Sequence, residues 1–316
     1  MKVIDLINSS KSTAFSFEIL PPLKGNSIQK VYNVIDKLIE FDPKYINITS
    51  HHSEYIYKTL PDGSFQKVNI RKRPGSVAIA SAIQNKYGIT AVPHIICKGF
   101  TKDETEYALI DLNFLGVYDL LLLRGDVKTL EAGQKTDIYH EHATDLQQQV
   151  NDFNKGIAID GSVFEANETP FSYGMACYPE KHEEAPNMES DIFYLKDKVK
   201  NGADYLVTQM FFDNEKYYAF VDRCRAEGIT VPIIPGIKPI VFKNQLTVLP
   251  KIFRSDIPEP FATELRKCKT DDEAKAVGVE WCIQQCKDLI AHGVPSLHFY
   301  TMMASDSVYK VAKEVY

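Results

Sequence analysis

The sequence lacks the features by which several classes of protein are recognised. No apolar run approaches the ~18 residues that a membrane-spanning helix requires, and no apolar segment with a small-residue cleavage site opens the chain. Its six cysteines form no C-x-x-C pair, and a chain of 316 residues does not depend on disulfides for stability. We therefore expect a cytoplasmic protein with no membrane partner.

Charge of one sign is not concentrated anywhere along the chain. The 36 Lys and Arg residues and 42 Asp and Glu residues give a net charge of −6, and they are spread without long single-sign blocks. Proteins that bind the phosphate backbone of nucleic acids usually carry a basic patch or stripe. We therefore expect no nucleic-acid partner.

Three common site motifs are also missing. No G-x-G-x-x-G follows the first apolar strand, no Walker loop is present, and no G-x-S-x-G elbow occurs. The adjacent His51 and His52, and the spacing of His140 and His142, lack the i, i+4 register that places two metal ligands on one helical face. We expect no Rossmann site, no P-loop and no metal site.

What the sequence does contain is a regular alternation of strand-like and helix-like segments. Apolar β-rich runs occupy 14–20, 44–49, 89–96, 119–124, 171–178, 205–212, 232–237 and 297–302. Nearly continuous apolar runs are typical of strands buried on both faces of a parallel sheet. Eight such units match an α/β fold of the (β/α)8 TIM-barrel type, and the absence of any linker predicts a single domain over 1–316. Extra helices are expected in 243–292, before the last strand.

Helix signals and long loops complete this prediction. One crossover helix should present an apolar stripe of Ile28, Val31, Ile35, Leu38 and Ile39. Thr101, followed three residues later by Glu104, has the spacing of a capping box. The polar stretches 51–74 and 126–140 follow the second and fourth strands, and we predict them to be loops over the barrel mouth that act as candidate lids.

In a (β/α)8 barrel the functional groups gather at the carboxyl ends of the strands. The polar residues expected there are Glu18, Thr49, His94, Arg124, Gly125, Asp126, Tyr178, His182, Gln209, His298, Tyr300 and Thr301. Each one alone has an ordinary structural explanation, such as a hydrogen bond inside the barrel. Their convergence on one mouth favours a functional site.

Two carboxylates in this set are expected to behave differently. Glu18 lies between Phe17 and Ile19, so desolvation should raise its pKa and keep it protonated near neutrality, as a general acid requires. On its own, Glu18 is equally compatible with a structural carboxylate held by a backbone amide. Asp126, beside Arg124, should instead remain ionised.

Seven segments resemble one known family in order and spacing. They are FEILPP (17–22), PHIIC (93–97), LRGD (123–126), ACYPEKHEEA (176–185), TQMFFD (208–213), IIPGIKPI (233–240) and HFYT (298–301). Any one of them is a weak signal, but together they resemble methylenetetrahydrofolate reductase of the short bacterial type, which consists of the catalytic barrel only.

The resemblance implies an FAD-dependent oxidoreductase that reduces 5,10-methylenetetrahydrofolate to 5-methyltetrahydrofolate with NAD(P)H. It implies ping-pong hydride transfer that feeds methionine synthesis, and a homo-oligomer, because family members are usually oligomeric. In this family Glu18 would be the general acid that helps open the imidazolidine ring, and Asp126 would tune charge near the flavin and the pterin. The choice between NADH and NADPH stays open.

The resemblance also assigns binding roles by position. FAD would be held by Thr49, His94, Arg124, Gly125, Asp126, Ala143, Tyr178, His182, Asp191 and Lys198, with Lys198 on the diphosphate and Asp191 on a ribose hydroxyl. Substrate would contact Gln209, Phe242 and Tyr300.

The sequence departs from the family pattern after HFYT. Met302-Met303-Ala304 replaces the usual Leu-Asn-Arg, so an arginine that helps to bind substrate is missing. One alternative stays open, a metal-dependent lyase or hydrolase that uses Glu18, Asp126, His140 and His142 as ligands. Another is a barrel that binds without catalysis.

Overall fold

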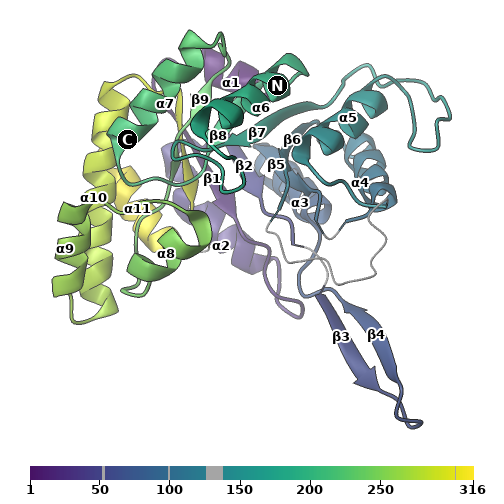
Figure 1. Cartoon of the computed structure of the whole chain (residues 1–316), viewed down its shortest axis with the longest axis horizontal. Helices are drawn as coiled ribbons and strands as arrows, with labels where there is room; N and C mark the ends of the chain where they lie inside the picture. Colours follow the sequence, from purple (N-terminus) through teal and green to yellow (C-terminus); the bar gives the residue numbers. More distant parts are fainter. Residues whose placement is uncertain (52–53, 99, 126–137, 303) are drawn as a thin grey trace. The chain divides into compact units, whose positions relative to one another are not determined.

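The computed structural model describes residues 1–51, 54–98, 100–125, 138–302 and 304–316. Its strands are β1 (Ala14–Ile19), β2 (Tyr45–Ile48), β3 (Glu54–Thr59), β4 (Phe65–Ile70), β5 (Thr90–Ile96), β6 (Asp119–Leu123), β7 (Ser172–Cys177), β8 (Tyr205–Thr208), β9 (Ile233–Ile234), β10 (Gly236–Ile237) and β11 (Ser296–Tyr300). Its helices are α1 (Val3–Ser9), α2 (Gln29–Leu38), the 3-10 turn η1 (Ile39–Phe41), α3 (Ser76–Tyr87), α4 (Lys102–Phe114), α5 (Ala143–Asn154), α6 (Met188–Lys200), α7 (Asn214–Ala226), α8 (Gln245–Phe253), α9 (Glu259–Lys267), α10 (Asp271–Ala291) and α11 (Ser305–Val315). Figure 1 shows these elements in sequence colours.

The main sheet has nine strands in the order β10-β11-β1-β2-β5-β6-β7-β8-β9. Adjacent pairs such as β1 with β11 and β7 with β8 run parallel. Only Pro235 separates β9 from β10, and they pair with β8 and β11 respectively, so the two ends of the order are halves of one strand. The sheet is therefore a nearly closed barrel with flanking helices, which confirms the predicted TIM-barrel fold.

The break in the seventh strand has a local cause. Proline has no N–H group to donate to a neighbouring strand, and Pro235 takes part only through its carbonyl, which accepts the N–H of His298 at 3.0 Å. The predicted strand 232–237 is therefore two short strands. Strand 205–212 was also predicted too long, because β8 ends at Thr208.

The chain folds into two compact units. Unit 1 comprises residues 1–19, 33–47 and 172–316, and unit 2 comprises residues 20–32 and 48–171. The expectation of a single domain over 1–316 stays a prediction.

The strands of unit 1 are held by aromatic packing in the barrel interior and beneath the helices. All six residues of β1 are buried, and the Phe15 ring lies 5.7 Å from that of Phe17 and 5.5 Å from that of Phe299. His298 stacks on Tyr45 with ring centroids 6.0 Å apart. Full burial of a large apolar side chain stabilises a fold by roughly 1.5–3 kcal/mol, so this cluster fixes β1 and β11 firmly beside each other.

The predicted apolar stripe of the first crossover helix is only partly right. Val31, Ile35 and Leu38 are fully buried, but Ile28 and Ile39 remain 37% and 42% exposed. They lie outside α2, which runs only from Gln29 to Leu38, so they do not continue its buried face.

The elaboration predicted between the seventh and eighth strands is confirmed. Helices α8, α9 and α10 precede β11, and in Figure 1 α9 and α10 lie side by side. The ring of Trp281 on α10 stacks on Phe261 of α9 at 4.5 Å, and its indole N–H donates to the carbonyl of Phe212 at 3.1 Å. This contact holds α9 and α10 against the segment that follows β8.

In unit 2, the stretch 51–74 was predicted as a loop, but it contains the antiparallel hairpin β3–β4. Every side chain from 56 to 67 is exposed, including Phe65 at 70%. The predicted capping box of α4 is confirmed, since the Thr101 hydroxyl accepts the Glu104 N–H at 3.1 Å and Glu104 accepts the Thr101 N–H at 3.0 Å.

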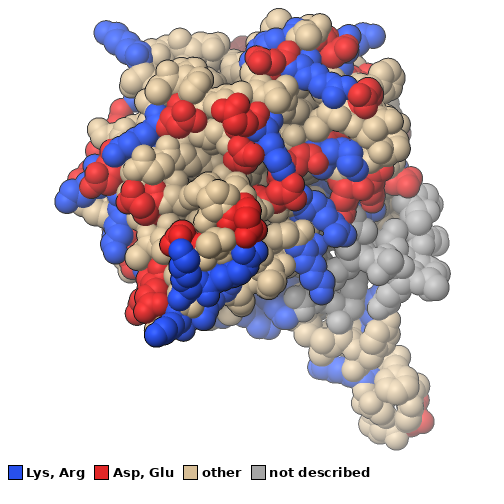
Figure 2. All heavy atoms as spheres, turned by 60° about the vertical axis from the view of Figure 1, so that its left-hand side comes forward, with Lys and Arg blue, Asp and Glu red and all other residues tan. Residues whose placement is uncertain are grey.

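Among the described residues, no helix combines the length and apolarity needed to cross a lipid bilayer. On the face shown in Figure 2, basic and acidic side chains are interspersed rather than gathered by sign.

Candidate functional site

Glu18 lies near the carboxyl end of β1, where it pairs in register with Tyr300 of β11. It is 9% exposed, between the fully buried Phe17 and Ile19. Desolvation raises the pKa of its carboxyl to about 8, although nearby Lys238 acts in the opposite direction. Glu18 is therefore a neutral acid at pH 7, as the sequence predicted.

The backbone around Glu18 is held in place from β11. The hydroxyl of Thr301, the residue after β11, donates to the Glu18 carbonyl. His298 on the same strand is a core residue, because it is fully buried, its Nδ1 lies 3.0 Å from the Ser16 hydroxyl, and burial lowers its pKa to about 3. β11 thus supports the acid without contributing a second titrating group near neutrality.

The three predicted substrate residues also belong to unit 1. The Tyr300 hydroxyl donates to the Thr208 carbonyl at 2.6 Å, which places its ring over the end of β8. Gln209 follows β8 directly, and its side-chain carbonyl accepts the Met210 N–H at 2.9 Å. Phe242 is 52% exposed, with its backbone N–H held by the side chain of Gln245 at 3.1 Å. An exposed aromatic on a fixed backbone suits stacking against a flat ring.

Lys238 is a polar residue of this site that the sequence analysis missed. It directly follows β10 and is only 4% exposed. Burial lowers the pKa of its ammonium, while the Glu18 carboxylate raises it. The signal was present in the sequence, because Lys238 interrupts the apolar run 233–240 at a strand end.

Four predicted FAD-binding residues gather around the segment after β7. The rings of Tyr178 and His182 meet edge to face at 4.7 Å. The carboxylate of Asp191, on α6, accepts the His182 N–H at 2.8 Å, and the Lys198 ammonium donates to the Ala176 carbonyl at 3.1 Å. Burial lowers the pKa of Lys198, and the charge of Asp191 opposes this shift. The structure therefore brings a cation, a carboxylate and two rings to one segment.

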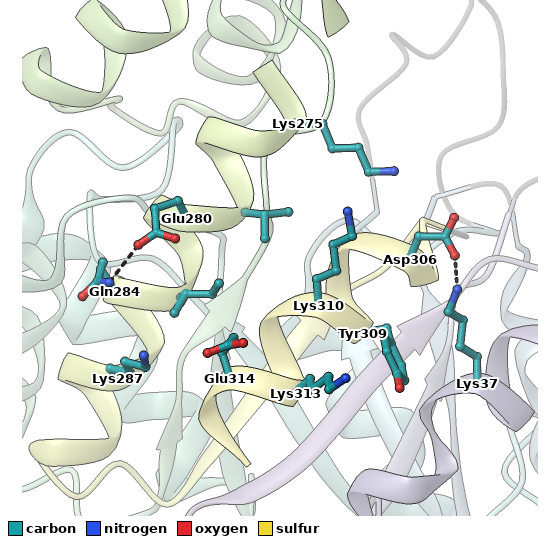
Figure 3. Close-up of a pocket in the computed structure, with 12 residues that line it drawn as sticks. Lys37, Lys275, Glu280, Gln284, Lys287, Asp306, Tyr309, Lys310, Lys313 and Glu314 are labelled. Carbon is teal, nitrogen blue, oxygen red and sulfur yellow. Dashed lines mark hydrogen bonds and ion pairs between the residues drawn. The ribbon is translucent and has the colours of Figure 1, made fainter. Parts of the chain in front are cut away.

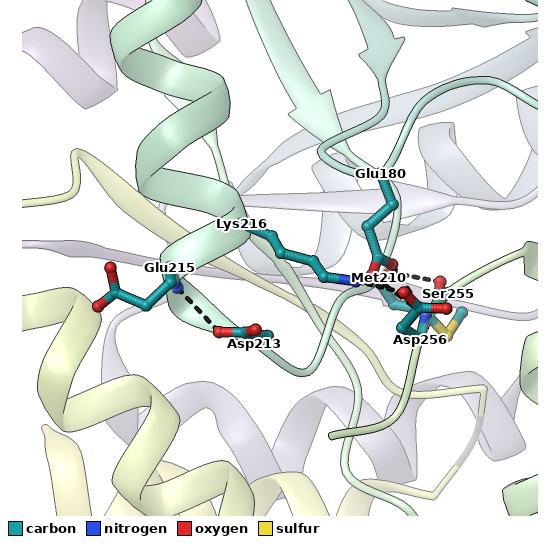
Figure 4. Close-up of polar contacts among 7 residues, drawn as sticks. All are labelled: Glu180, Met210, Asp213, Glu215, Lys216, Ser255 and Asp256. Atoms are coloured by element: carbon teal, nitrogen blue, oxygen red, sulfur yellow. Dashed lines mark hydrogen bonds and ion pairs between the residues drawn. The ribbon is translucent and has the colours of Figure 1, made fainter. Parts of the chain in front are cut away.

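An ion-pair network also anchors the segment after β7 (Figure 4). The Glu180 carboxylate lies 2.5 Å from the Lys216 ammonium and accepts the Asp256 N–H at 3.0 Å, and Lys216 also pairs with the Asp256 carboxylate. The Glu180 side chain is only 11% exposed. This network ties the segment after β7 to α7 and to the turn after α8, and sequence reasoning had not identified it.

Unit 2 carries the remaining described FAD candidates. His94 on β5 is 4% exposed and pairs in register with Leu121 of β6. Arg124 follows β6, and its carbonyl accepts the Lys98 N–H at 3.1 Å. Gly125 comes next in the chain, Thr49 follows β2 with its hydroxyl 3.1 Å from His51, and Ala143 is the first residue of α5.

Asp126 lies outside the described residues, as does most of the predicted lid 126–140. Its assigned role stays a prediction. Ala304, the position at which the resemblance implies an arginine, stands at the N-cap of α11, and its methyl side chain carries no charge.

The histidines of the metal-site alternative have other surroundings. His140 contacts the side-chain carbonyl of Gln149, and His142 is the N-cap of α5. Within the described part of the chain, no group of three His, Cys, Asp or Glu side chains is arranged to hold a metal ion.

A groove elsewhere in unit 1 does not contain any of the predicted site residues. It has a volume of about 740 Å³ and lies along α10 and α11, with Lys275, Lys310 and Lys313 on its walls (Figure 3). Lys37 pairs with Asp306 at its edge. The groove lies on the outer helices and is separate from the Glu18 site.

Comparison with known families gives a match over almost the whole chain. The family model described as methylenetetrahydrofolate reductase matches residues 2–316. A 5,10-methylenetetrahydrofolate reductase of Escherichia coli (strain K12) is 30% identical over 94% of this chain and 88% of the relative. A probable methylenetetrahydrofolate reductase (NADPH) of Caenorhabditis elegans is 30% identical over 99% of this chain. A methylenetetrahydrofolate reductase (NADH) 1 of Arabidopsis thaliana is 30% identical over 97%.

The chain spans less than half of these two eukaryotic relatives, 43% and 49% of their lengths. Among solved structures, a protein of Clostridium thermocellum described as binding two copies of 5-methyl-5,6,7,8-tetrahydrofolic acid aligns with a TM-score of 0.54 and 15% identity, over 98% of each chain. At that identity the likeness supports the fold.

Proposed function

Because the chain belongs to the methylenetetrahydrofolate reductase family, we propose that it reduces 5,10-methylenetetrahydrofolate to 5-methyltetrahydrofolate with FAD as cofactor and NAD(P)H as reductant. The observation that carries the proposal is Glu18, a buried carboxyl with a pKa of about 8 at the carboxyl end of a barrel strand. A group that holds its proton at neutral pH in a dry site is suited to general acid catalysis.

The residues around β7 fit the chemistry of a flavin dinucleotide. A lysine ammonium carries three N–H donors, so the bond from Lys198 to Ala176 is compatible with a further contact to a phosphate oxygen. A carboxylate such as Asp191 accepts several hydrogen bonds, so it suits a ribose hydroxyl in addition to the His182 N–H. When bound, FAD would supply the hydride chemistry, and the protein would supply orientation and charge.

We assign the remaining FAD contacts as the resemblance implies. They are Thr49, His94, Arg124, Gly125, Asp126, Ala143, Tyr178 and His182. For substrate, the exposed ring of Phe242 would stack on the flat pterin or nicotinamide, and Gln209 and Tyr300 would line the site beside Glu18.

The proposed acid step balances as a single proton transfer. As the imidazolidine ring of the folate opens toward an iminium, the Glu18 O–H bond breaks and an N–H bond forms on the departing ring nitrogen. Glu18 is left as a carboxylate and regains its proton from solvent before the next turnover. Asp126, as a fixed negative charge, would tune the flavin and the pterin.

The wider assignments belong to the same proposal. Nucleotide and folate would use the site in turn, giving ping-pong kinetics, and the methylated product would feed methionine synthesis. We further propose a cytoplasmic homo-oligomer.

The two half-reactions test the acid assignment separately. In stopped-flow experiments, Glu18→Gln should leave reduction of the flavin by NADH or NADPH nearly unchanged and abolish reduction of the folate. Glu314→Gln, which alters an exposed carboxylate on α11, is the matched control and should affect neither half-reaction. Equal loss of both half-reactions in Glu18→Gln would make Glu18 a structural residue. A purified protein that stays colourless with added FAD would exclude the flavoenzyme.

A further inference from the structure

Lys238 and Glu18 are brought together by the register of three consecutive barrel strands. On one side of β11, Gly236 pairs with His298 and Ile237 with Phe299, so Lys238 follows at the level of Tyr300. On the other side of β11, Glu18 pairs with that same Tyr300. Lys238, Tyr300 and Glu18 therefore form one row at the carboxyl ends of β10, β11 and β1.

The segment that carries Lys238 is fixed on both sides. Before it, the Gly236 N–H donates to the Thr208 hydroxyl at 2.9 Å, and the Tyr300 ring packs so closely that a Cβ on Gly236 would lie 2.5 Å from it. After it, Gly278 of α10 approaches the backbone so closely that a Cβ there would lie 2.0 Å from the Ile240 carbonyl oxygen. The backbone that carries Lys238 is thus fixed on both sides.

Both side chains of the pair are withdrawn from water, Lys238 at 4% and Glu18 at 9% exposure. A buried carboxylate without a counter-charge is strongly disfavoured. Other titratable groups face this row from neighbouring elements. They are Tyr45 on β2, Cys177 and Tyr178 at the end of β7, and Cys282 on α10. In the described part of the chain, Lys238 supplies the positive charge that acts on Glu18.

We propose that Lys238 is a positioning residue whose buried ammonium stabilises the Glu18 carboxylate formed when Glu18 gives its proton to the folate. This inference rests on the proposed role of Glu18 as the acid. In the step, the Glu18 O–H bond breaks, the proton forms an N–H bond on the folate, and Lys238 keeps its own three protons throughout. The ammonium charge offsets the negative charge that develops on Glu18, at a point fixed before the reaction begins.

The physical need for such a group follows from burial. Desolvation makes Glu18 hold its proton at neutral pH, but the same desolvation makes the proton hard to release. An opposite charge within about 4–6 Å lowers a carboxyl pKa by about 1–3 units, and the Lys238 ammonium acts on Glu18 in this direction. Desolvation therefore keeps Glu18 protonated in the resting site, and the charge of Lys238 makes that proton easier to release.

Lys238→Met is the direct test, because methionine matches the length of the lysine stem and tolerates a buried site. In the holoenzyme, folate reduction should fall as pH rises through the pKa of Glu18. Lys238→Met should shift this alkaline limb, the fall in folate-reduction rate at high pH, to higher pH by about 1–3 units. It should also lower the maximal rate of folate reduction at lower pH, while flavin reduction by NAD(P)H is unchanged. Lys251→Met, which removes an exposed lysine on α8, is the matched control and should shift nothing. Lys238→Arg keeps the positive charge, so the alkaline limb of its folate-reduction profile should lie close to that of the wild type.

Infrared difference titration reads the Glu18 proton without the folate reaction. The carboxyl band that is absent from Glu18→Gln identifies the residue, and its midpoint should rise in Lys238→Met and in Lys238→Gln, the second variant in case the first does not fold. An unchanged or lowered midpoint would overturn the inference. If the infrared midpoint shifts but the alkaline limb does not, the coupling of Lys238 to Glu18 stands and the acid role of Glu18 is wrong.

Discussion

The raised pKa of Glu18 predicts a pH dependence of stability that has a definite sign. The unfolded chain releases this proton near the ordinary pKa of 4.5, whereas the folded protein keeps it up to about pH 8. Between these values the folded state binds more protons than the unfolded state, so the free energy of unfolding falls as pH rises. The contribution of protonated Glu18 to the free energy of unfolding is fully present below pH 4.5 and is lost by about pH 8.

The size of the effect follows from the shift. A rise of about 3.5 pH units, at about 1.4 kcal/mol for each unit, corresponds to about 5 kcal/mol. Glutamine is neutral at every pH and has nearly the same shape, so Glu18→Gln should remove this contribution. Relative to the wild type, the variant should therefore gain roughly 3–5 kcal/mol of stability between pH 5 and pH 8.5.

Urea unfolding of both proteins at pH 5, 6, 7 and 8.5, with the same excess of FAD throughout, measures this difference. The comparison removes the contribution of titrating groups that both proteins share. A difference between the two proteins that does not change with pH, or that changes in favour of the wild type, would show that Glu18 is not protonated in the folded protein at neutral pH.

Three further substitutions test the packing described above. Gly278→Ala should lower the free energy of unfolding by roughly 1–3 kcal/mol, because the new Cβ would meet the Ile240 carbonyl. Replacing Gly by Ala inside a helix ordinarily stabilises the protein, so a higher thermal midpoint would contradict this prediction. Lys216→Met should lower the free energy of unfolding by roughly 1–3 kcal/mol, because Glu180 loses its ammonium partner. The same change should weaken FAD binding, which flavin fluorescence measures, and unchanged binding would mean that the network does not support the cofactor. Thr101→Val should cost about 1 kcal/mol by removing the cap of α4, while Thr101→Ser should cost much less in the same thermal melts.

Much of the barrel was predictable because buried parallel strands carry their signal locally. The apolar runs at 14–20 and 89–96 correspond closely to β1 and β5. The run at 205–212 was misleading, because Met210 and Phe212 are buried by the helices before β11 and Phe211 stacks on Tyr217 of α7, rather than packing as part of a strand. Local apolarity identifies burial, but it does not say which element provides it.

The hairpin β3–β4 has a local signal in its turn. Two β-rich runs flank Pro61-Asp62-Gly63, a sequence that favours a turn, and the Asp62 carboxylate does accept the Ser64 N–H at 2.9 Å. Residues 56–67 are exposed on both faces of the hairpin, so this stretch lacks the apolar alternation that marks a half-buried strand and resembles a polar loop.

For the candidate site, the sequence indicates the surroundings of single residues but not which residues act on one another. The apolar residues on either side of Glu18 indicated a strand buried on both faces, and burial is what raises the Glu18 pKa. Lys238 acts on Glu18 only because β10, β11 and β1 lie in register, and that register is a property of the closed sheet. The Glu180 network likewise joins three segments that are distant in the chain.

Unit 1 is built from segments that lie far apart in the chain, and this affects the order in which the protein folds during synthesis. Unit 2 is nearly continuous, since its larger part runs from 48 to 171 and contains the paired β5 and β6. β1 instead pairs with β11, and the Ser16 hydroxyl reaches a carbonyl 281 residues further along the chain. We therefore expect β1 to wait for β11 until most of the chain has been made, with only its other neighbour, β2, available early.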